Sequence, residues 1–287
     1  MTRFPKRLPV ALLGLVLCLG ATGCNKLKAR DQLNKGVQAY KAGRYEEAIQ
    51  HFQQSVNEDP QLGVAKLYLA TAYVGQYVPG VDTPENNRNA ELAIEQYQSV
   101  LDAGPSRSNK ILALKGIASL YFNMKKFDKA KEFNQKVIQE DPADPETYYS
   151  IGVIDWTQAY QNRNNIRNSL GLTGDAPIPD KDKKDCETLA TQNQDLIRDG
   201  MEKLNKAIDL RKDYDDAMAY INLMYREKAA IECGDADARQ ADLKTADDWV
   251  TKAMDTKRAK AEKQSKQGGI VVDQNAGGNQ QQQQQQQ

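Results

Sequence analysis

The sequence has one histidine, His51, and four cysteines among its 287 residues. Histidine-based nucleophilic catalysis needs that residue held between a nucleophile and an acid, and zinc sites draw on clustered histidines and cysteines. No glycine-rich phosphate loop is present, and the acids recur at the spacing of solvated helix faces. We therefore expect no enzymatic activity, no resident metal and no cofactor.

An excess of positive charge is also missing. Lysine plus arginine and aspartate plus glutamate each number 39. Arg3, Lys6 and Arg7 lie within positions 1–23, which hold no acid, so the chain from Cys24 onward has 36 bases against 39 acids and a net charge of −3. Binding to phosphate backbones needs clustered positive charge, so we expect no nucleic-acid partner.

The segment before Cys24 has the pattern of an export signal. After the three bases, Leu8–Ala21 is an uncharged apolar run, and small residues precede Cys24. The run is short for a bilayer span and ends in a cleavage-type motif, which indicates a secretory signal peptide over residues 1–23.

Leu19–Cys24 resembles a bacterial lipobox, in which the cysteine becomes the lipid-modified first residue of the mature protein. Ala21 departs from the pattern because leucine is commonest there, and Ala21-x-Gly23 would also suit an ordinary signal peptidase. Cysteine parity favours lipidation, since it leaves an even pair instead of three thiols in an exported chain. Aspartate after the cysteine commonly means inner-membrane retention in such lipoproteins. Asn25 stands there instead, so the resemblance implies a lipid anchor in the outer membrane, facing the periplasm.

A repeat organises the rest of the chain. Gly43–Ala48 followed by Asn57–Pro60 can be laid on Lys125–Ala130 followed by Gln139–Pro142, with helical apolar spacing between. Weaker copies of the pattern, which combines small, aromatic and apolar residues, are Ala93, Tyr97, Val100 and Pro105; Gly200, Leu204 and Ala207; and Ala246, Val250 and Ala253. Each copy follows a segment with helical spacing that carries a small or polar residue, namely Gly36, Ala70, Ala118, Gly152 and Asn222.

The separation from Gly36 to Ala70 equals that from Ala118 to Gly152. The pattern resembles the tetratricopeptide repeat, a helix–turn–helix unit whose period of about 34 residues matches this separation. The resemblance implies an all-α fold, an α-solenoid of about five helix hairpins in which stacking buries apolar faces that one hairpin could not bury alone. We place the solenoid at residues 30–254, after a lipidated linker at 24–29.

Insertions interrupt the second, fourth and fifth repeats, at Gly75–Asn89, between Trp156 and Gly200, and near Cys233–Asp235. The insertion in the fourth repeat is expected to lengthen both helices and to leave a loop at Gly171–Pro179. All three insertions fall at the turn inside a hairpin, so they either form a binding edge or merely extend the helices.

Residues 255–287 change in composition. Lys257–Lys263 indicates a polar helix end whose bases either stay solvated or touch anionic lipid. From Gln267 to the eight glutamines of Gln280–Gln287 little can be buried, so a disordered Gln-rich tail is expected.

Cys186 and Cys233 are expected on neighbouring antiparallel helices that meet at a turn near Asp213, and Cys186 lies farther along the chain from that turn than Cys233 does. At about 1.5 Å per residue the two cysteines differ by about 10 Å in height, unless the helix before Thr188 bends or starts late. They are either a disulfide, as an oxidising compartment favours, or two buried thiols.

In tetratricopeptide proteins the first helices of successive repeats line a groove that takes peptides. Carried over by repeat phase, the resemblance places in that groove Leu33, Val37, Tyr40, Leu67, Thr71, Lys115, Phe122, Tyr149, Trp156 and Arg226. Lys115 alone does not reproduce the family's carboxylate clamp, so apolar and aromatic anchors are expected to supply the affinity. Alternatively, many of these side chains simply pack between repeats.

Together these features favour a non-enzymatic scaffold of the bacterial cell envelope, held to the membrane by its lipid and docking a protein segment in the groove. The alternative is a lipoprotein that binds envelope polysaccharide or assists an enzyme through its insertion loops.

Overall fold

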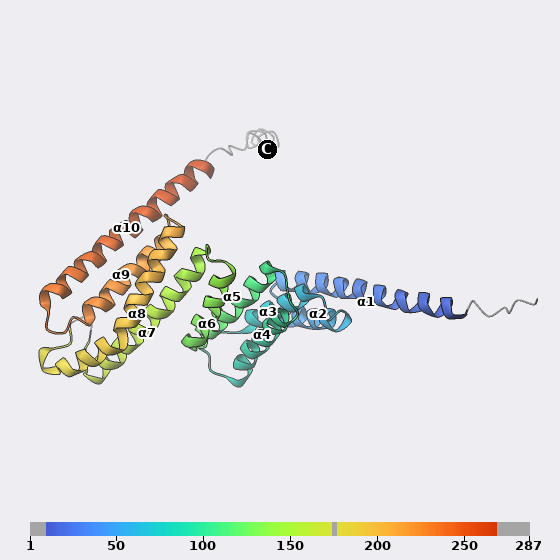
Figure 1. The fold of residues 1–287 in the computed structure, drawn as a ribbon, viewed down its shortest axis with the longest axis horizontal. Helices are drawn as coiled ribbons and strands as arrows, with labels where there is room; N and C mark the ends of the chain where they lie inside the picture. The colour runs from blue at the N-terminus through green and yellow to red at the C-terminus, as the bar shows by residue number, and fades with distance from the viewer. Residues whose placement is uncertain (1–9, 174–176, 269–287) are drawn as a thin grey trace, which may run out of the picture. The chain divides into compact units, whose positions relative to one another are not determined.

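The computed structural model describes residues 10–173 and 177–268, with side chains for 24–173 and 177–265. These residues form ten α-helices and one 3₁₀ turn, without strands (Figure 1). The helices are α1 Val10–Lys41, α2 Tyr45–Glu58, α3 Gly63–Gln76, α4 Pro84–Asp102, α5 Arg107–Asn123, α6 Phe127–Glu140, α7 Pro145–Ser169, α8 Lys183–Leu210, α9 Asp215–Ala230 and α10 Ala236–Gly268.

The chain divides into two compact units, Met1–Ala143 and Asp144–Gln287. Within the first unit α1 packs on α2, α3 on α4 and α5 on α6, while α2 and α4 also contact the helix that follows each. Within the second unit α7 packs on α8 and α9 on α10, and α9 also contacts both α7 and α8. The five helix hairpins expected from the repeat pattern are therefore present in the described residues.

The helix boundaries follow local chemistry. Pro84 begins α4, where its missing N–H is not needed, and the Thr83 hydroxyl accepts a hydrogen bond from the Asn86 backbone N–H at 3.2 Å. Between α1 and α2 the turn places Gly43 at a φ of 74°, which a residue without a β-carbon adopts easily. Pro60 and Pro105 lie in the turns after α2 and α4.

The small residues of the repeat allow the two helices of a hairpin to approach closely. A methyl group on Gly36 would lie 2.4 Å from Cε1 of Phe52, a fully buried ring on α2. A methyl on Gly152 of α7 would lie 2.5 Å from Cγ of Leu204 on α8. Neither position can accept a side chain without moving its neighbour.

The predicted start of the solenoid needs adjustment, whereas the polar helix end expected at Lys257–Lys263 is part of α10. Residues 24–29 are helical, as part of α1, rather than a linker, because Ala29 is buried and its carbonyl accepts a hydrogen bond from the Ser55 hydroxyl at 2.7 Å. At the other end, α10 continues the helix to Gly268. The start of the expected signal peptide, residues 1–9, and most of the expected glutamine-rich tail, residues 269–287, lie outside the described residues.

The insertion in the fourth repeat does lengthen both helices of its hairpin. α7 and α8 have 25 and 28 residues, against 14 in α2 and 14 in α3. Residues 174–176, in the loop expected between these two helices, lie outside the described residues. In the second repeat, Asn86 fixes the insertion loop: its side chain accepts a hydrogen bond from the Val78 N–H at 2.7 Å and donates to the Val78 and Val81 carbonyls.

Cys186 and Cys233 form a disulfide, with their Cα atoms 5.7 Å apart. α8 already begins at Lys183, so a late helix start does not remove the expected difference in height. Instead α9 ends at Ala230, and the non-helical residues after it cover more distance per residue than a helix does. That brings Cys233 level with the first turn of α8.

Candidate partner-binding site

A row of aromatic side chains runs along the face that α7 and α9 share in the second unit. We call Tyr149, Trp156, Tyr160 and Tyr220 the aromatic row. Tyr220 of α9 lies edge-on between Tyr149 and Trp156, with ring centroids 5.5 and 5.3 Å away, and Trp156 stacks on Tyr160 at 5.2 Å. Positions 149, 156 and 160 differ by seven and four residues, so they lie on one face of the helix.

One end of the row is fixed by Tyr214, whose ring lies 5.1 Å from that of Tyr149. The Tyr214 hydroxyl and Arg211 both donate hydrogen bonds to the Glu146 carboxylate. Desolvation opposes the charge on Glu146, but these two hydrogen bonds outweigh it and lower the pKa of Glu146. Burial raises the pKa values of Tyr149 and Tyr214, and both therefore remain neutral donors at physiological pH.

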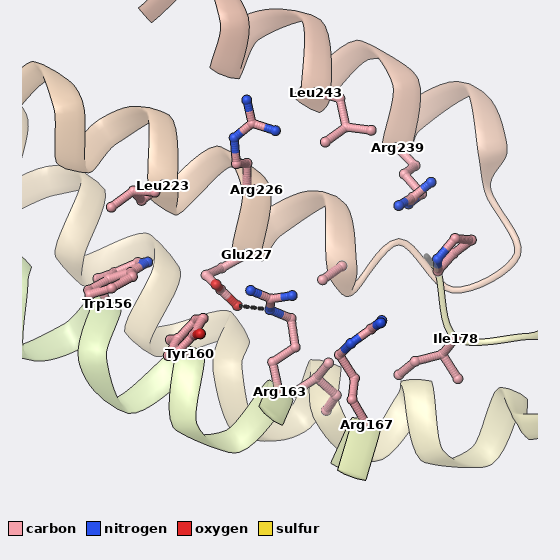
Figure 2. Close-up of a pocket in the computed structure, with 13 residues that line it drawn as sticks. Trp156, Tyr160, Arg163, Arg167, Ile178, Leu223, Arg226, Glu227, Arg239 and Leu243 are labelled. Carbon is pink, nitrogen blue, oxygen red and sulfur yellow. Dashed lines mark hydrogen bonds and ion pairs between the residues drawn. The ribbon is translucent and has the colours of Figure 1, made fainter. Parts of the chain in front are cut away.

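The other end of the row opens into a cavity of about 290 Å³, shown in Figure 2. Trp156 and Tyr160 form part of its wall, and Leu223, Leu243 and Ile178 contribute apolar surface. Its described lining also includes four arginines and one carboxylate, namely Arg163, Arg167, Arg226, Arg239 and Glu227. We call this cavity the arginine pocket.

The arginines come from three helices. Arg163 of α7 donates from Nε to Oε2 of Glu227 on α9 at 2.9 Å, and the two side chains are 14% and 2% exposed. The Arg163 guanidinium also lies 5.2 Å from the centre of the Tyr160 ring, which links the pocket to the aromatic row. A buried carboxylate needs such a partner, because an uncompensated charge in the interior is costly.

The other three arginines of the lining differ in their surroundings. Arg167 is buried and donates to the Thr173 carbonyl at 3.2 Å. Arg226 is more exposed and donates to Asn222 at 2.9 Å and to the exposed Asp247 at 2.8 Å. Figure 2 shows Arg239 of α10 facing Arg163 and Arg167 of α7 across the cavity.

The residues predicted for the groove fall into different environments. Tyr149, Trp156 and Arg226 come together in the second unit, two in the aromatic row and one at the pocket. In the first unit, the alternative interpretation, in which these side chains simply pack between repeats, describes the structure better. Leu33, Val37 and Tyr40 pack against the hydrophobic core, Leu67 is buried, and the Thr71 hydroxyl donates to the Leu67 carbonyl of its own helix. Lys115 and Phe122 are partly buried on α5.

Four residues of the pocket were not predicted from the sequence, namely Arg163, Arg167, Glu227 and Arg239. A signal for the first two was available: they follow Trp156 at seven and eleven residues, the spacing of one helix face. The repeat pattern placed the residues after Trp156 in an insertion, so the predicted groove did not extend beyond Trp156. Glu227 and Arg239 enter the site only through the packing of α9 and α10, which spacing along one helix does not reveal.

His51 lies outside this site, with Nδ1 2.7 Å from Oε1 of Gln32. Over the described residues no group of three or more histidine, cysteine, aspartate or glutamate side chains is placed to hold a metal. Cys24 is a free, exposed cysteine on α1. Among the helices that the structure describes, none combines the length and the apolar character that crossing a bilayer requires.

Two parts of the sequence match known repeat families. Residues 29–62 and residues 116–144 each match a family described as tetratricopeptide repeat. The first match covers the end of α1 and all of α2, and the second covers the end of α5 and all of α6. No curated protein matches the sequence.

Several solved structures share the fold. MamA from Desulfovibrio magneticus RS-1, from residue 41 to its end, is 18% identical, with 81% of this chain and 96% of that chain covered and a TM-score of 0.52. Another MamA structure is 16% identical, with 82% and 94% covered and a TM-score of 0.52. YrrB, described as a TPR protein with an unusual peptide-binding site, is 13% identical, with 85% and 97% covered and a TM-score of 0.50.

The fold is thus an all-α solenoid of the tetratricopeptide type, as the hairpins and the structural likeness to MamA show. Within this solenoid, residues 29–62 and 116–144 are the two stretches that match tetratricopeptide repeats.

Proposed function

We propose that this protein is a scaffold that docks a segment of a partner protein along the α7–α9 face and holds it at a membrane of the bacterial envelope. The observation that carries the docking proposal is the aromatic row. Its Tyr160 is 39% exposed, and the row continues into the arginine pocket. Aromatic anchors dominate the energetics of many protein interfaces. The peptide-binding site ascribed to YrrB, a protein of similar fold, supports the same use of this one.

Replacing Trp156 tests the docking proposal. Crosslinking in membranes followed by capture of the full-length protein is expected to recover defined protein partners, and Trp156→Ala should reduce that recovery at least tenfold. The reason is that the change removes a ring packed against both Tyr160 and Tyr220. Quantitative mass spectrometry of the captured proteins measures the effect.

Trp249→Ala is the matched control, because Trp249 lies on α10 outside the row and its ring instead contacts Lys252. Equal recovery with both variants would contradict docking at the row. Recovery of envelope glycan without any protein partner would favour the alternative, a polysaccharide-binding lipoprotein.

We further propose that Cys24 carries the lipid. Its position after Leu19–Gly23 fits the lipobox-like pattern, and several acyl chains on one cysteine would hold the protein firmly, at about 0.8 kcal/mol per buried methylene. Asn25 favours the outer membrane. The cleaved chain would then start within α1, and the core contacts of Ala29 would remain.

Cys24→Ala is expected to move the protein from the membrane fraction to the soluble fraction, because the change removes the sulfur atom to which the lipid would be attached. Fractionation and intact mass of the N-terminal peptide measure both effects. An unmodified Cys24 in the wild-type protein would contradict the anchor and leave the docking proposal standing.

A further inference from the structure

The proposed lipid site at Cys24 lies very close to the folded core of the first unit. Cys24 is on α1, and Ala29, one and a half turns further along the same helix, is fully buried. The Ala29 carbonyl accepts the hydrogen bond from the Ser55 hydroxyl at 2.7 Å, which ties this part of α1 to α2. Because a helix rises about 1.5 Å per residue, Cys24 lies only about 7.5 Å along the helix axis from the core. A lipid on Cys24 would therefore hold the end of the first hairpin at the bilayer surface.

The helical segment between the lipid site and the core has the composition of a membrane-contacting helix. Leu27 is 73% exposed, the highest value among the exposed large apolar side chains of the described residues. Lys26 and Lys28 flank it, Arg30 follows, and all three bases are exposed. Long basic side chains can keep their charged groups among lipid headgroups while an apolar neighbour enters the boundary of the acyl chains.

The charges around this segment leave an excess of positive charge. Residues 24–30 contain three bases and no acid, and the next acid along the chain, Asp31, pairs with Lys35 at 2.7 Å. Glu58 and Asp59, at the end of α2, follow soon after the residue that binds Ala29 and offset two of the three bases. A surplus of one positive charge remains in a chain that is negative overall from Cys24 onward. Anionic lipid headgroups attract such a surface.

We propose that residues 24–30 of α1 lie in the headgroup region of an anionic bilayer, with Leu27 inserted toward the acyl chains and the three bases next to lipid phosphates. This inference rests on the proposed lipid at Cys24 and deepens it. The anchor would place the end of the first hairpin directly on the membrane, instead of holding the solenoid away from it on a flexible tether.

Site-directed spin labelling of the full-length lipidated protein, in vesicles of phosphatidylethanolamine and phosphatidylglycerol, tests the inference. A nitroxide on Leu27→Cys should show a ratio of collisions with oxygen to collisions with a water-soluble nickel chelate at least threefold above that on Glu46→Cys. The reason is that oxygen concentrates among acyl chains, whereas the chelate stays in water. Glu46 is the matched control because it is exposed in the first turn of α2, at the other end of the same hairpin. The label reacts with the introduced cysteine, since Cys24 would carry the lipid and Cys186 and Cys233 are bridged.

Neutralising the bases tests the role of charge. The triple variant Lys26→Gln, Lys28→Gln and Arg30→Gln should lower the collision ratio at Leu27→Cys by at least half, and so should replacing phosphatidylglycerol by phosphatidylcholine. A control with the same change of charge, made at exposed bases of the second unit, should leave the ratio unchanged. Its substitutions are Arg198→Gln, Lys206→Gln and Lys212→Gln.

Intact mass of the N-terminal peptide separates this inference from the anchor proposal. An unmodified Cys24 would overturn both. A lipidated Cys24, with equal collision ratios at Leu27→Cys and Glu46→Cys, would overturn the membrane contact and leave the anchor standing. A high ratio at Leu27→Cys that neither the triple variant nor phosphatidylcholine lowers would overturn the role of the bases. A high ratio that both changes lower, and that the second-unit control does not, supports the inference.

Discussion

Removing the Cys186–Cys233 disulfide is expected to lower the free energy of unfolding of the second unit by about 2–4 kcal/mol. The bond joins the first turn of α8 to the segment after α9 across a sequence separation of 47 residues. Closing a loop of that length restricts the unfolded chain by about 4 kcal/mol in the chain-entropy model, and residual structure in the unfolded state lowers the figure. Urea unfolding with and without reductant measures the difference.

The control is the double variant Cys186→Ala with Cys233→Ala, whose stability reductant should leave unchanged. Its unfolding free energy should resemble that of the reduced wild type, because Ala differs little in size from a buried cysteine. Identical unfolding curves for oxidised and reduced wild type, with two free thiols in the intact mass, would contradict the bridge.

Gly152→Val is expected to destabilise the second unit by about 3 kcal/mol, near the upper end for overpacking a core. Even the first carbon of the new side chain would lie 2.5 Å from Leu204 Cγ and 3.2 Å from the Gly200 carbonyl oxygen, so α7 and α8 must separate. The loss should exceed the gain from replacing a helical glycine, which is about 0.5–1 kcal/mol for alanine. Thermal and urea unfolding followed by circular dichroism measure the effect.

Gly63→Val provides the comparison, because Gly63 begins α3 and nothing lies within 4 Å of a β-carbon built there. Its unfolding free energy should change by no more than about 0.5 kcal/mol. If the two variants lose equal stability, the close approach of α7 and α8 at Gly152 does not limit the packing of this hairpin.

The sequence predicted the hairpins because their signals are local. The repeated small residues, Gly36 and Gly152 among them, lie where a side chain would collide with the facing helix. Apolar spacing at about 3.6 residues per turn indicated the helices, and Pro60, Pro105 and Pro142 marked the turns after α2, α4 and α6. The lengthening of α7 and α8 also followed from counting residues between repeat positions.

The site could be predicted only in part, because it depends on contacts between helices far apart in sequence. Tyr149 and Trp156 keep the repeat phase, and the sequence identified them. Glu227 is buried against Arg163, which is 64 residues away, and that pairing follows from the packing of α7 against α9. Repeat phase also could not separate Leu33 and Val37, which pack on the first unit's core, from side chains available to a partner.

The most direct test of partner docking is a crystal structure of the full chain with a peptide selected against it. The account predicts that the peptide lies along α7 and α9, with apolar side chains on Trp156 and Tyr160. A peptide bound on any other face, with the aromatic row left uncovered, would contradict it.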